Sequence, residues 1–105
     1  MITIVMALAL AAPNPNSIDA PRKAFATCLK GFESKTLAAK VDAGTYSTMV
    51  KTACPTEAAA LTSALVNYDV AMGTKRATAA TNAERDVDDY RLTSEDRYKD
   101  MLGGP

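Results

Sequence analysis

Residues 41–55 read VDAGTYSTMVKTACP and contain both of the turns on which the predicted fold depends. In Val41-Asp42-Ala43-Gly44, the aspartate can cap a following helix, and the glycine weakens any helix that would continue through this point. In Ala53-Cys54-Pro55, the proline disfavours helical geometry at the residue before it and suits the first turn of a new helix. Residues 43–53 are therefore predicted to form a short helix with a corner at each end.

An amphipathic helix is predicted before the first turn, over about residues 20–40. Asp19 supplies a capping carboxylate, and Pro21 is tolerated in a first turn. Together with residues 43–53, this segment predicts a helical hairpin. Its apolar face follows the three- and four-residue spacing of a helix, with Phe25, Cys28, Leu29, Phe32, Thr36 and Ala39.

A long third helix is predicted over about residues 55–101. Its apolar side chains advance by three, four or seven residues, a heptad-like stripe typical of a coiled coil. No proline between Pro55 and Pro105 forces the helix to end. The segment from Gly73 to Asn82, however, contains a glycine, an asparagine and three threonines, which are weak helix formers. The sequence therefore leaves open a break there. From about residue 84 the helix is heavily charged and is expected to extend beyond the hairpin.

These elements predict an all-α protein of three helices in a single domain, residues 19–105. The β-branched residues are scattered, and no Asn-Gly or Asp-Gly hairpin signal is present. At 105 residues, the chain is small enough for a covalent crosslink to matter to its stability.

The N-terminus is predicted to be a signal peptide, residues 1–12, followed by a linker at residues 13–18. The apolar run over residues 2–12 is too short to span a bilayer and ends in small residues. Two cleavage sites fit, Ala7-Leu8-Ala9 and Ala9-Leu10-Ala11. No lysine or arginine precedes the run, so an apolar tail on a cytosolic protein is the alternative. The expected location is the periplasm or the exterior.

Cys28 and Cys54 are the only cysteines, and each lies 13 residues from position 41. At 1.5 Å per residue, both would lie about 19 Å from the turn and therefore level across the hairpin. In an oxidising compartment, two cysteines of a small chain usually pair. A structural disulfide is the main prediction. Two free buried thiols and a redox-active pair remain alternatives, although the C-x-x-C spacing of a catalytic dithiol is absent.

The composition excludes several kinds of chemistry. The chain has no histidine, which is the commonest general base and metal ligand, and two cysteines cannot complete a structural zinc site. We expect no enzyme activity, no cofactor and no metal. Residues 19–51 carry six basic and three acidic groups, and residues 52–105 carry six basic and nine acidic groups. This split is too weak for nucleic-acid binding, but it could favour packing of the two halves or head-to-tail association.

The charged end of the third helix carries the candidate partner-binding residues. Val87, Tyr90, Tyr98 and Met101 share one stripe, and a helix extending past the hairpin has nothing in its own chain to cover it. This predicts a protein partner or self-association through the C-terminal helix. The alternative is that the four residues pack within the chain.

The leader, Cys28 in an amphipathic helix, Ala53-Cys54-Pro55 and the long C-terminal helix together resemble the small exported two-cysteine helical proteins of bacterial envelopes. That group has no assigned activity, and the resemblance implies no catalytic residues. The expected function is a structural or protein-binding role in the envelope. Two alternatives are an inhibitor or regulator of an envelope enzyme, acting through a rigid loop at residues 41–45, and a thiol-redox protein.

Overall fold

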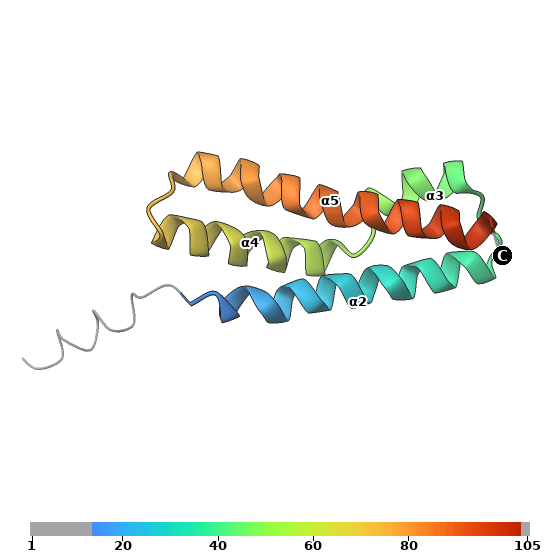
Figure 1. The fold of residues 1–105 in the computed structure, drawn as a ribbon, viewed down its shortest axis with the longest axis horizontal. Coiled ribbons are helices and arrows are strands. Elements are labelled where there is room, and N and C mark those ends of the chain that lie inside the picture. Colours follow the sequence, from blue (N-terminus) through green and yellow to red (C-terminus); the bar gives the residue numbers. More distant parts are fainter. Residues whose placement is uncertain (1–13, 104–105) are drawn as a thin grey trace, which may run out of the picture.

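The computed structural model describes residues 14–103, which form an elongated helical bundle (Figure 1). The helices are α2 (Asn16–Ala38), α3 (Ala43–Val50), α4 (Pro55–Ala71) and α5 (Arg76–Gly103). The described residues contain no strand, so the all-α prediction is confirmed. The predicted signal peptide, residues 1–12, lies outside the described residues. No helix among residues 14–103 combines the length and the apolar character needed to cross a membrane.

The start of α2 lies earlier than predicted: Pro15 occupies the N-cap position, and a turn at Asn14 precedes it. The Asn14 Oδ1 accepts a hydrogen bond of 3.0 Å from the Asn16 backbone N–H. The hydroxyl and the backbone N–H of Ser17 both donate to the Asn14 carbonyl. Residues 16–18 of the expected linker are therefore helical, and Pro21 lies inside the helix.

Both turns predicted in residues 41–55 are present. The Asp42 carboxylate accepts a hydrogen bond of 2.8 Å from the Thr45 backbone N–H and so caps α3. At the second turn, Cys54 adopts a left-handed backbone conformation with φ 55°, and α4 begins at Pro55. The predicted hairpin helix is shorter than expected, since α3 ends at Val50.

The prediction of three helices is wrong, because the expected long helix is divided into α4 and α5. α4 ends in a hydrogen-bonded cap around Gly73, whose φ of 102° favours glycine. The Thr74 N–H donates to the Asp69 carbonyl at 2.9 Å, and the Gly73 N–H donates to the Val70 carbonyl at 3.0 Å. The chain then reverses, so α5 packs back along the bundle instead of extending beyond it (Figure 1).

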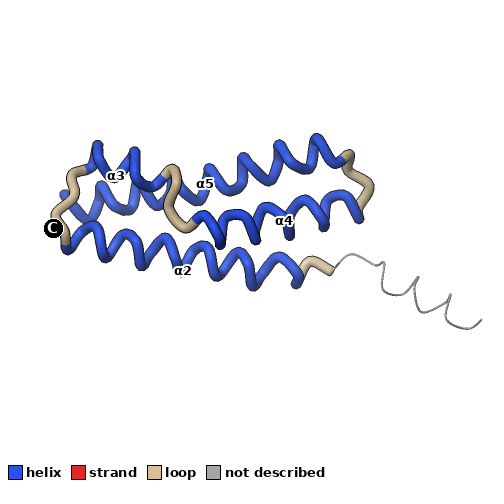
Figure 2. Tube along the Cα trace, turned by 180° about the vertical axis from the view of Figure 1, so that it is seen from behind, coloured by secondary structure: helices blue, strands red, loops and turns tan. Residues whose placement is uncertain are grey.

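α2 and α5 run along the bundle, and α3 and α4 occupy successive stretches beside them (Figure 1). α5 packs on α4 and α3, and α2 packs on α4 and α5 (Figure 2). Since α3 and α4 both run opposite to α2 and α5, the two long helices run in the same direction. The heptad-like stripe of the sequence is thus used inside the chain's own bundle.

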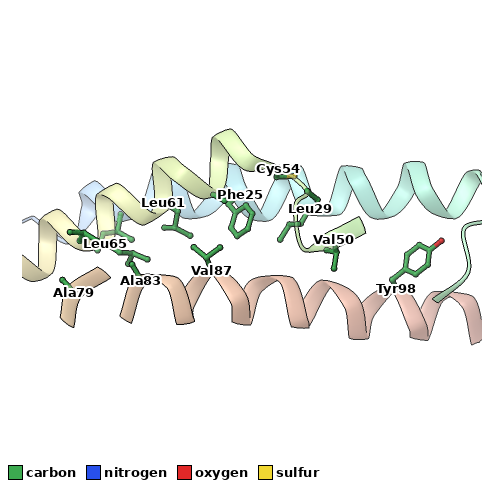
Figure 3. Packing of buried hydrophobic residues seen from close by; sticks show 14 of the residues in the cluster. Phe25, Leu29, Val50, Cys54, Leu61, Leu65, Ala79, Ala83, Val87 and Tyr98 are labelled. Atoms are coloured by element: carbon green, nitrogen blue, oxygen red, sulfur yellow. The ribbon is translucent and has the colours of Figure 1, made fainter. Parts of the chain in front are cut away.

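The core follows the shared interior of these helices (Figure 3). Ala79 and Ala83 are buried where α5 faces α4, and their small side chains allow the two helices to approach closely. Aromatic rings fill the half of the bundle that contains α3, where the Tyr46 and Tyr98 rings stack with centroids 3.9 Å apart. The fully buried large side chains are Phe25, Leu29, Tyr46, Val50, Leu61 and Tyr98.

Replacing Lys40 with glycine is expected to stabilise the protein. Lys40 follows the end of α2 with φ 59°, a left-handed conformation that costs an L-residue about 1–2 kcal/mol. Glycine avoids this cost but loses more freedom on folding, so we expect a net gain of about 0.5–1 kcal/mol. Urea denaturation measures the difference. Lys40→Ala is the control, because it removes the charge and keeps the Cβ. A gain as large for alanine as for glycine would contradict the backbone explanation.

Candidate functional site

A disulfide joins Cys28 in α2 to Cys54 at the corner between α3 and α4, as predicted. The two Cα atoms lie 6.1 Å apart, and 26 positions separate the two residues in the sequence. The crosslink therefore attaches the corner between α3 and α4 to the centre of α2.

Arg91 of α5 holds the same corner from the opposite side. Its Nη2 donates a hydrogen bond of 2.8 Å to the Ala53 carbonyl, and its guanidinium lies 5.4 Å from the centroid of the Phe25 ring. Among the described residues, Nε is buried without a hydrogen-bond partner. The corner is thus held by a covalent bond to α2 and by a hydrogen bond from the Arg91 side chain of α5.

The disulfide also bears on metal binding. In the described part of the chain, Cys28, Cys54 and Glu57 bring possible ligand atoms within 4.8 Å of one another. Metal ions bind the thiolate form of cysteine, and both sulfur atoms here are bonded to each other. In the disulfide form this group therefore does not make a metal site.

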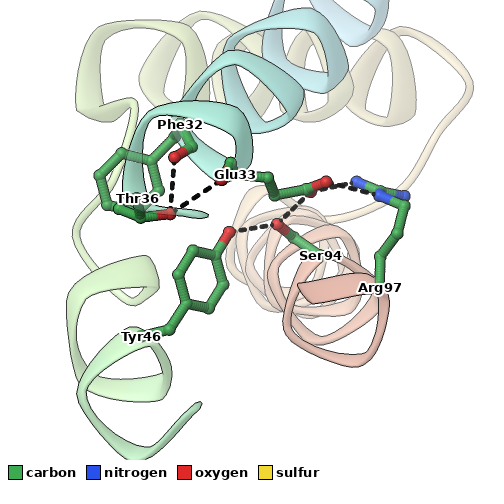
Figure 4. Close-up of polar contacts among 6 residues, drawn as sticks. All are labelled: Phe32, Glu33, Thr36, Tyr46, Ser94 and Arg97. Atoms are coloured by element: carbon green, nitrogen blue, oxygen red, sulfur yellow. Dashed lines mark hydrogen bonds and ion pairs between the residues drawn. The ribbon is translucent and has the colours of Figure 1, made fainter. Parts of the chain in front are cut away.

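A buried polar network joins α2, α3 and α5 (Figure 4). The Glu33 carboxylate is only 3% exposed. Its Oε1 accepts a hydrogen bond of 2.9 Å from Arg97 Nε, and its Oε2 accepts bonds of 2.5 Å each from Arg97 Nη2 and Ser94 Oγ. Because Ser94 donates its one hydroxyl proton to Glu33, the Tyr46 hydroxyl must be the donor in its 2.7 Å bond to Ser94 Oγ.

The network shifts the pKa of two of its members, Tyr46 and Arg97. Burial raises the pKa of the Tyr46 hydroxyl, which therefore keeps its proton at neutral pH. The hydrogen bond with Glu33 raises the pKa of Arg97, which therefore remains a cation. With hydrogen bonds to both carboxylate oxygens, the buried Glu33 links α2 to α5 directly and to α3 through Ser94 and Tyr46.

Most of the predicted partner-binding residues lie in the chain's own core. Val87 and Tyr98 are buried, and Tyr98 donates a hydrogen bond to the Val41 carbonyl at 2.5 Å. Tyr90 is half-buried, packs against Phe25 and accepts a hydrogen bond from Arg22. Met101 is 38% exposed. The reversal after α4 turns this stripe toward the core, which is the alternative that the sequence left open.

An apolar groove of about 390 Å³ opens between α3 and α5, beside the disulfide corner. Val50 lines it from the core, and Leu92 lines it from α5 with 57% of its surface exposed. Two basic and two acidic side chains complete the lining: Lys51, Asp88, Arg91 and Glu95. An apolar centre with charges of both signs around it is suited to binding a polypeptide segment.

One wall of this groove is fixed by hydrogen bonds. Ser47 donates to Glu95 Oε1 at 2.6 Å, and Lys99 Nζ lies 3.6 Å from the same oxygen. The bond from Ser47 lowers the pKa of Glu95, so this carboxylate is ionised at neutral pH. The groove was not predicted from the sequence. The available signal was Leu92, a large apolar residue that stands alone in a charged segment.

The turn proposed as an inhibitory loop lies away from the disulfide. Asp42 and the bond from Tyr98 to the Val41 carbonyl hold this turn in place. It precedes α3, however, whereas Cys54 follows α3 at its other end. The structure therefore does not bring the turn and the disulfide together.

Comparison with known proteins found no matching family model, no matching curated protein and no matching solved structure.

Proposed function

We propose that this chain is an exported, non-enzymatic protein that binds a protein partner through the groove between α3 and α5. The observation that carries the proposal is the exposed Leu92 side chain beside the buried Val50, in a groove that lies next to the disulfide corner. The partner would insert one or two apolar side chains and pair its own charges with Lys51, Asp88 and Glu95.

The position of the disulfide supports this function. Val50 and Lys51 line the groove and directly precede the corner that Cys54 attaches to α2. A surface held in its binding conformation loses less conformational entropy when a partner docks. The disulfide would thus favour binding as well as folding.

The periplasm or the exterior is the proposed location. A disulfide persists in an oxidising compartment, and the apolar N-terminal run resembles a signal peptide. Mass spectrometry of the intact secreted protein tests this. The expected mass corresponds to a chain that begins after Ala9 or Ala11 and lacks the two thiol hydrogens. An uncleaved chain with two alkylatable thiols would contradict it.

Leu92→Glu is expected to abolish partner binding without unfolding the protein. Leu92 is 57% exposed, so its replacement places a charge at the centre of the groove and leaves the core intact. Met72→Glu is the matched control, because Met72 is 59% exposed and lies outside the groove. Crosslinking in the source periplasm, followed by quantitative mass spectrometry, compares the proteins captured by each variant.

The expected result is a partner captured by the wild type and by Met72→Glu, but reduced at least about tenfold for Leu92→Glu, which corresponds to about 1.4 kcal/mol. Melting temperatures should agree for the three proteins. Equal capture by Leu92→Glu and the wild type would exclude the groove as the binding surface.

A further inference from the structure

A second groove, of about 310 Å³, runs between α2 and α5. All of its lining residues come from these two helices, so neither α3 nor α4 covers it. Ala26 and Thr93 line it with small side chains, which leave room for another molecule to approach. This face lies on the other flank of α5 from the proposed partner groove.

The two edges of this face carry opposite charges at the same spacing. On α2, Lys23 and Lys30 are exposed and seven residues apart; on α5, Asp89 and Asp96 are exposed and seven residues apart. Seven helical residues correspond to a rise of about 10.5 Å. Lys30 and Asp89 line the same groove, yet within the described residues none of these four side chains forms an ion pair.

The charges repeat along each edge. Asp86 and Asp100 lie on the same side of α5 as the two aspartates, and the basic Arg97 within the groove is already paired with Glu33. Arg22 in α2 is likewise engaged, with the Tyr90 hydroxyl. Asp19 is the one exposed acidic residue of α2. On α5, the exposed Arg85 lies four residues before Asp89 on the same side of the helix. The face is therefore mainly basic along α2 and mainly acidic along α5.

Such a face is complementary to itself under one particular rotation. Because α2 and α5 run in the same direction, a twofold axis parallel to the bundle places α5 of one copy against α2 of the other. A twofold axis across the bundle would instead place α2 on α2 and α5 on α5, bringing like charges together. Only the first arrangement pairs lysine with aspartate, and it does so on both sides of the axis.

The positions of the charged side chains along the bundle axis agree with this arrangement. The Phe25–Tyr90 ring contact and the Glu33–Ser94 hydrogen bond place Asp89 level with residues 24–28 of α2, and Asp96 level with residues 31–35. A rotation about the bundle axis preserves these levels. Each aspartate then lies about one helical turn from a lysine of the other copy, within reach of a lysine side chain.

We propose that the face formed by α2 and α5 is a self-docking surface, on which two copies of this chain pair in parallel with Lys23 and Lys30 of each copy facing Asp89 and Asp96 of the other. The contact is largely electrostatic, so it weakens as salt screens the charges. It uses residues other than those of the partner groove, and the tests of the two surfaces can therefore fail separately.

The test uses two charge-reversal variants, Lys23→Glu/Lys30→Glu and Asp89→Lys/Asp96→Lys. Each alone presents like charges to its own copy, whereas a mixture of the two restores opposite charges at both contacts. Sedimentation velocity at about 20 mM and about 0.5 M salt measures the association. Lys75→Glu/Arg76→Glu is the control, since both side chains are exposed and lie outside this face and outside the partner groove.

We expect the wild type and the control to dimerise at low salt and to dissociate at high salt. Each reversal variant alone should bind itself at least about tenfold more weakly, and the equimolar mixture should recover dimers. Circular dichroism verifies that all variants are folded. A wild type that stays monomeric at low salt, reversal variants that dimerise as well as the wild type, or a mixture that fails to recover dimers would each overturn the proposal.

Discussion

Replacing both Cys28 and Cys54 with serine is expected to lower the free energy of unfolding by about 3.5 kcal/mol. The disulfide closes a loop across 26 residues and restricts the unfolded chain, and the chain-entropy relation gives this magnitude. The loss is large for a domain of this size, since small proteins are stable by only about 5–15 kcal/mol. Urea denaturation of the oxidised wild type and of the double variant measures it.

The wild type unfolded in the presence of a dithiol reductant is the control. It should have the same transition midpoint as the serine variant, because both lack the same crosslink. A loss below about 1 kcal/mol would contradict the entropic account. It would mean that the unfolded chain without the crosslink retains structure that already keeps residues 28 and 54 close together.

Replacing Arg97 with alanine is expected to destabilise the protein by about 3 kcal/mol. The substitution leaves the Glu33 carboxylate buried with only the bond from Ser94, and an unpaired buried charge typically costs about 3–5 kcal/mol. The lower end of that range is expected, because the Arg97 side chain is itself partly exposed and water can enter in its place. Thermal and urea denaturation at neutral pH measure the loss.

Lys99→Ala is the matched control, since it removes an exposed ion pair of the same helix. Its expected cost is below about 0.5 kcal/mol. The double variant Glu33→Met/Arg97→Met should recover at least half of the loss, because no charge is then buried and Ser94 can turn its hydroxyl toward its own helix backbone. An Arg97→Ala variant as stable as Lys99→Ala would contradict a structural role for the network.

The parts of the fold that depend on local sequence were predictable. The cap at Asp42, the corner before Pro55 and the pairing of Cys28 with Cys54 all follow from nearby residues and from spacing within one hairpin.

The sequence left the break between α4 and α5 open, although Gly73 carries its signal. The apolar spacing continues across the break, because α4 and α5 each turn one face toward the same core. Periodicity therefore does not distinguish one long helix from two antiparallel helices. The burial of Val87 and Tyr98 depends on this reversal, so the sequence did not decide between the core and an exposed stripe for these residues.

The buried network was outside the reach of sequence reasoning. Glu33 lies among the polar residues of α2, and its partners Ser94 and Arg97 follow about sixty positions later. A charged residue is buried only where partners from other elements satisfy it, and no local pattern reveals such partners. The groove beside Leu92 likewise exists only once α3 packs against α5.

The corner at Cys54 is the point where the chain passes from α3 to α4 while α2 and α5 continue alongside. One core cluster runs past this point, with Phe25, Cys54 and Leu61 among its members. The disulfide attaches the corner to the centre of α2. Val50 and Lys51, which line the partner groove, lie close before Cys54, whereas α2 lines the self-docking face. A single covalent bond therefore links the segments that form the two proposed surfaces.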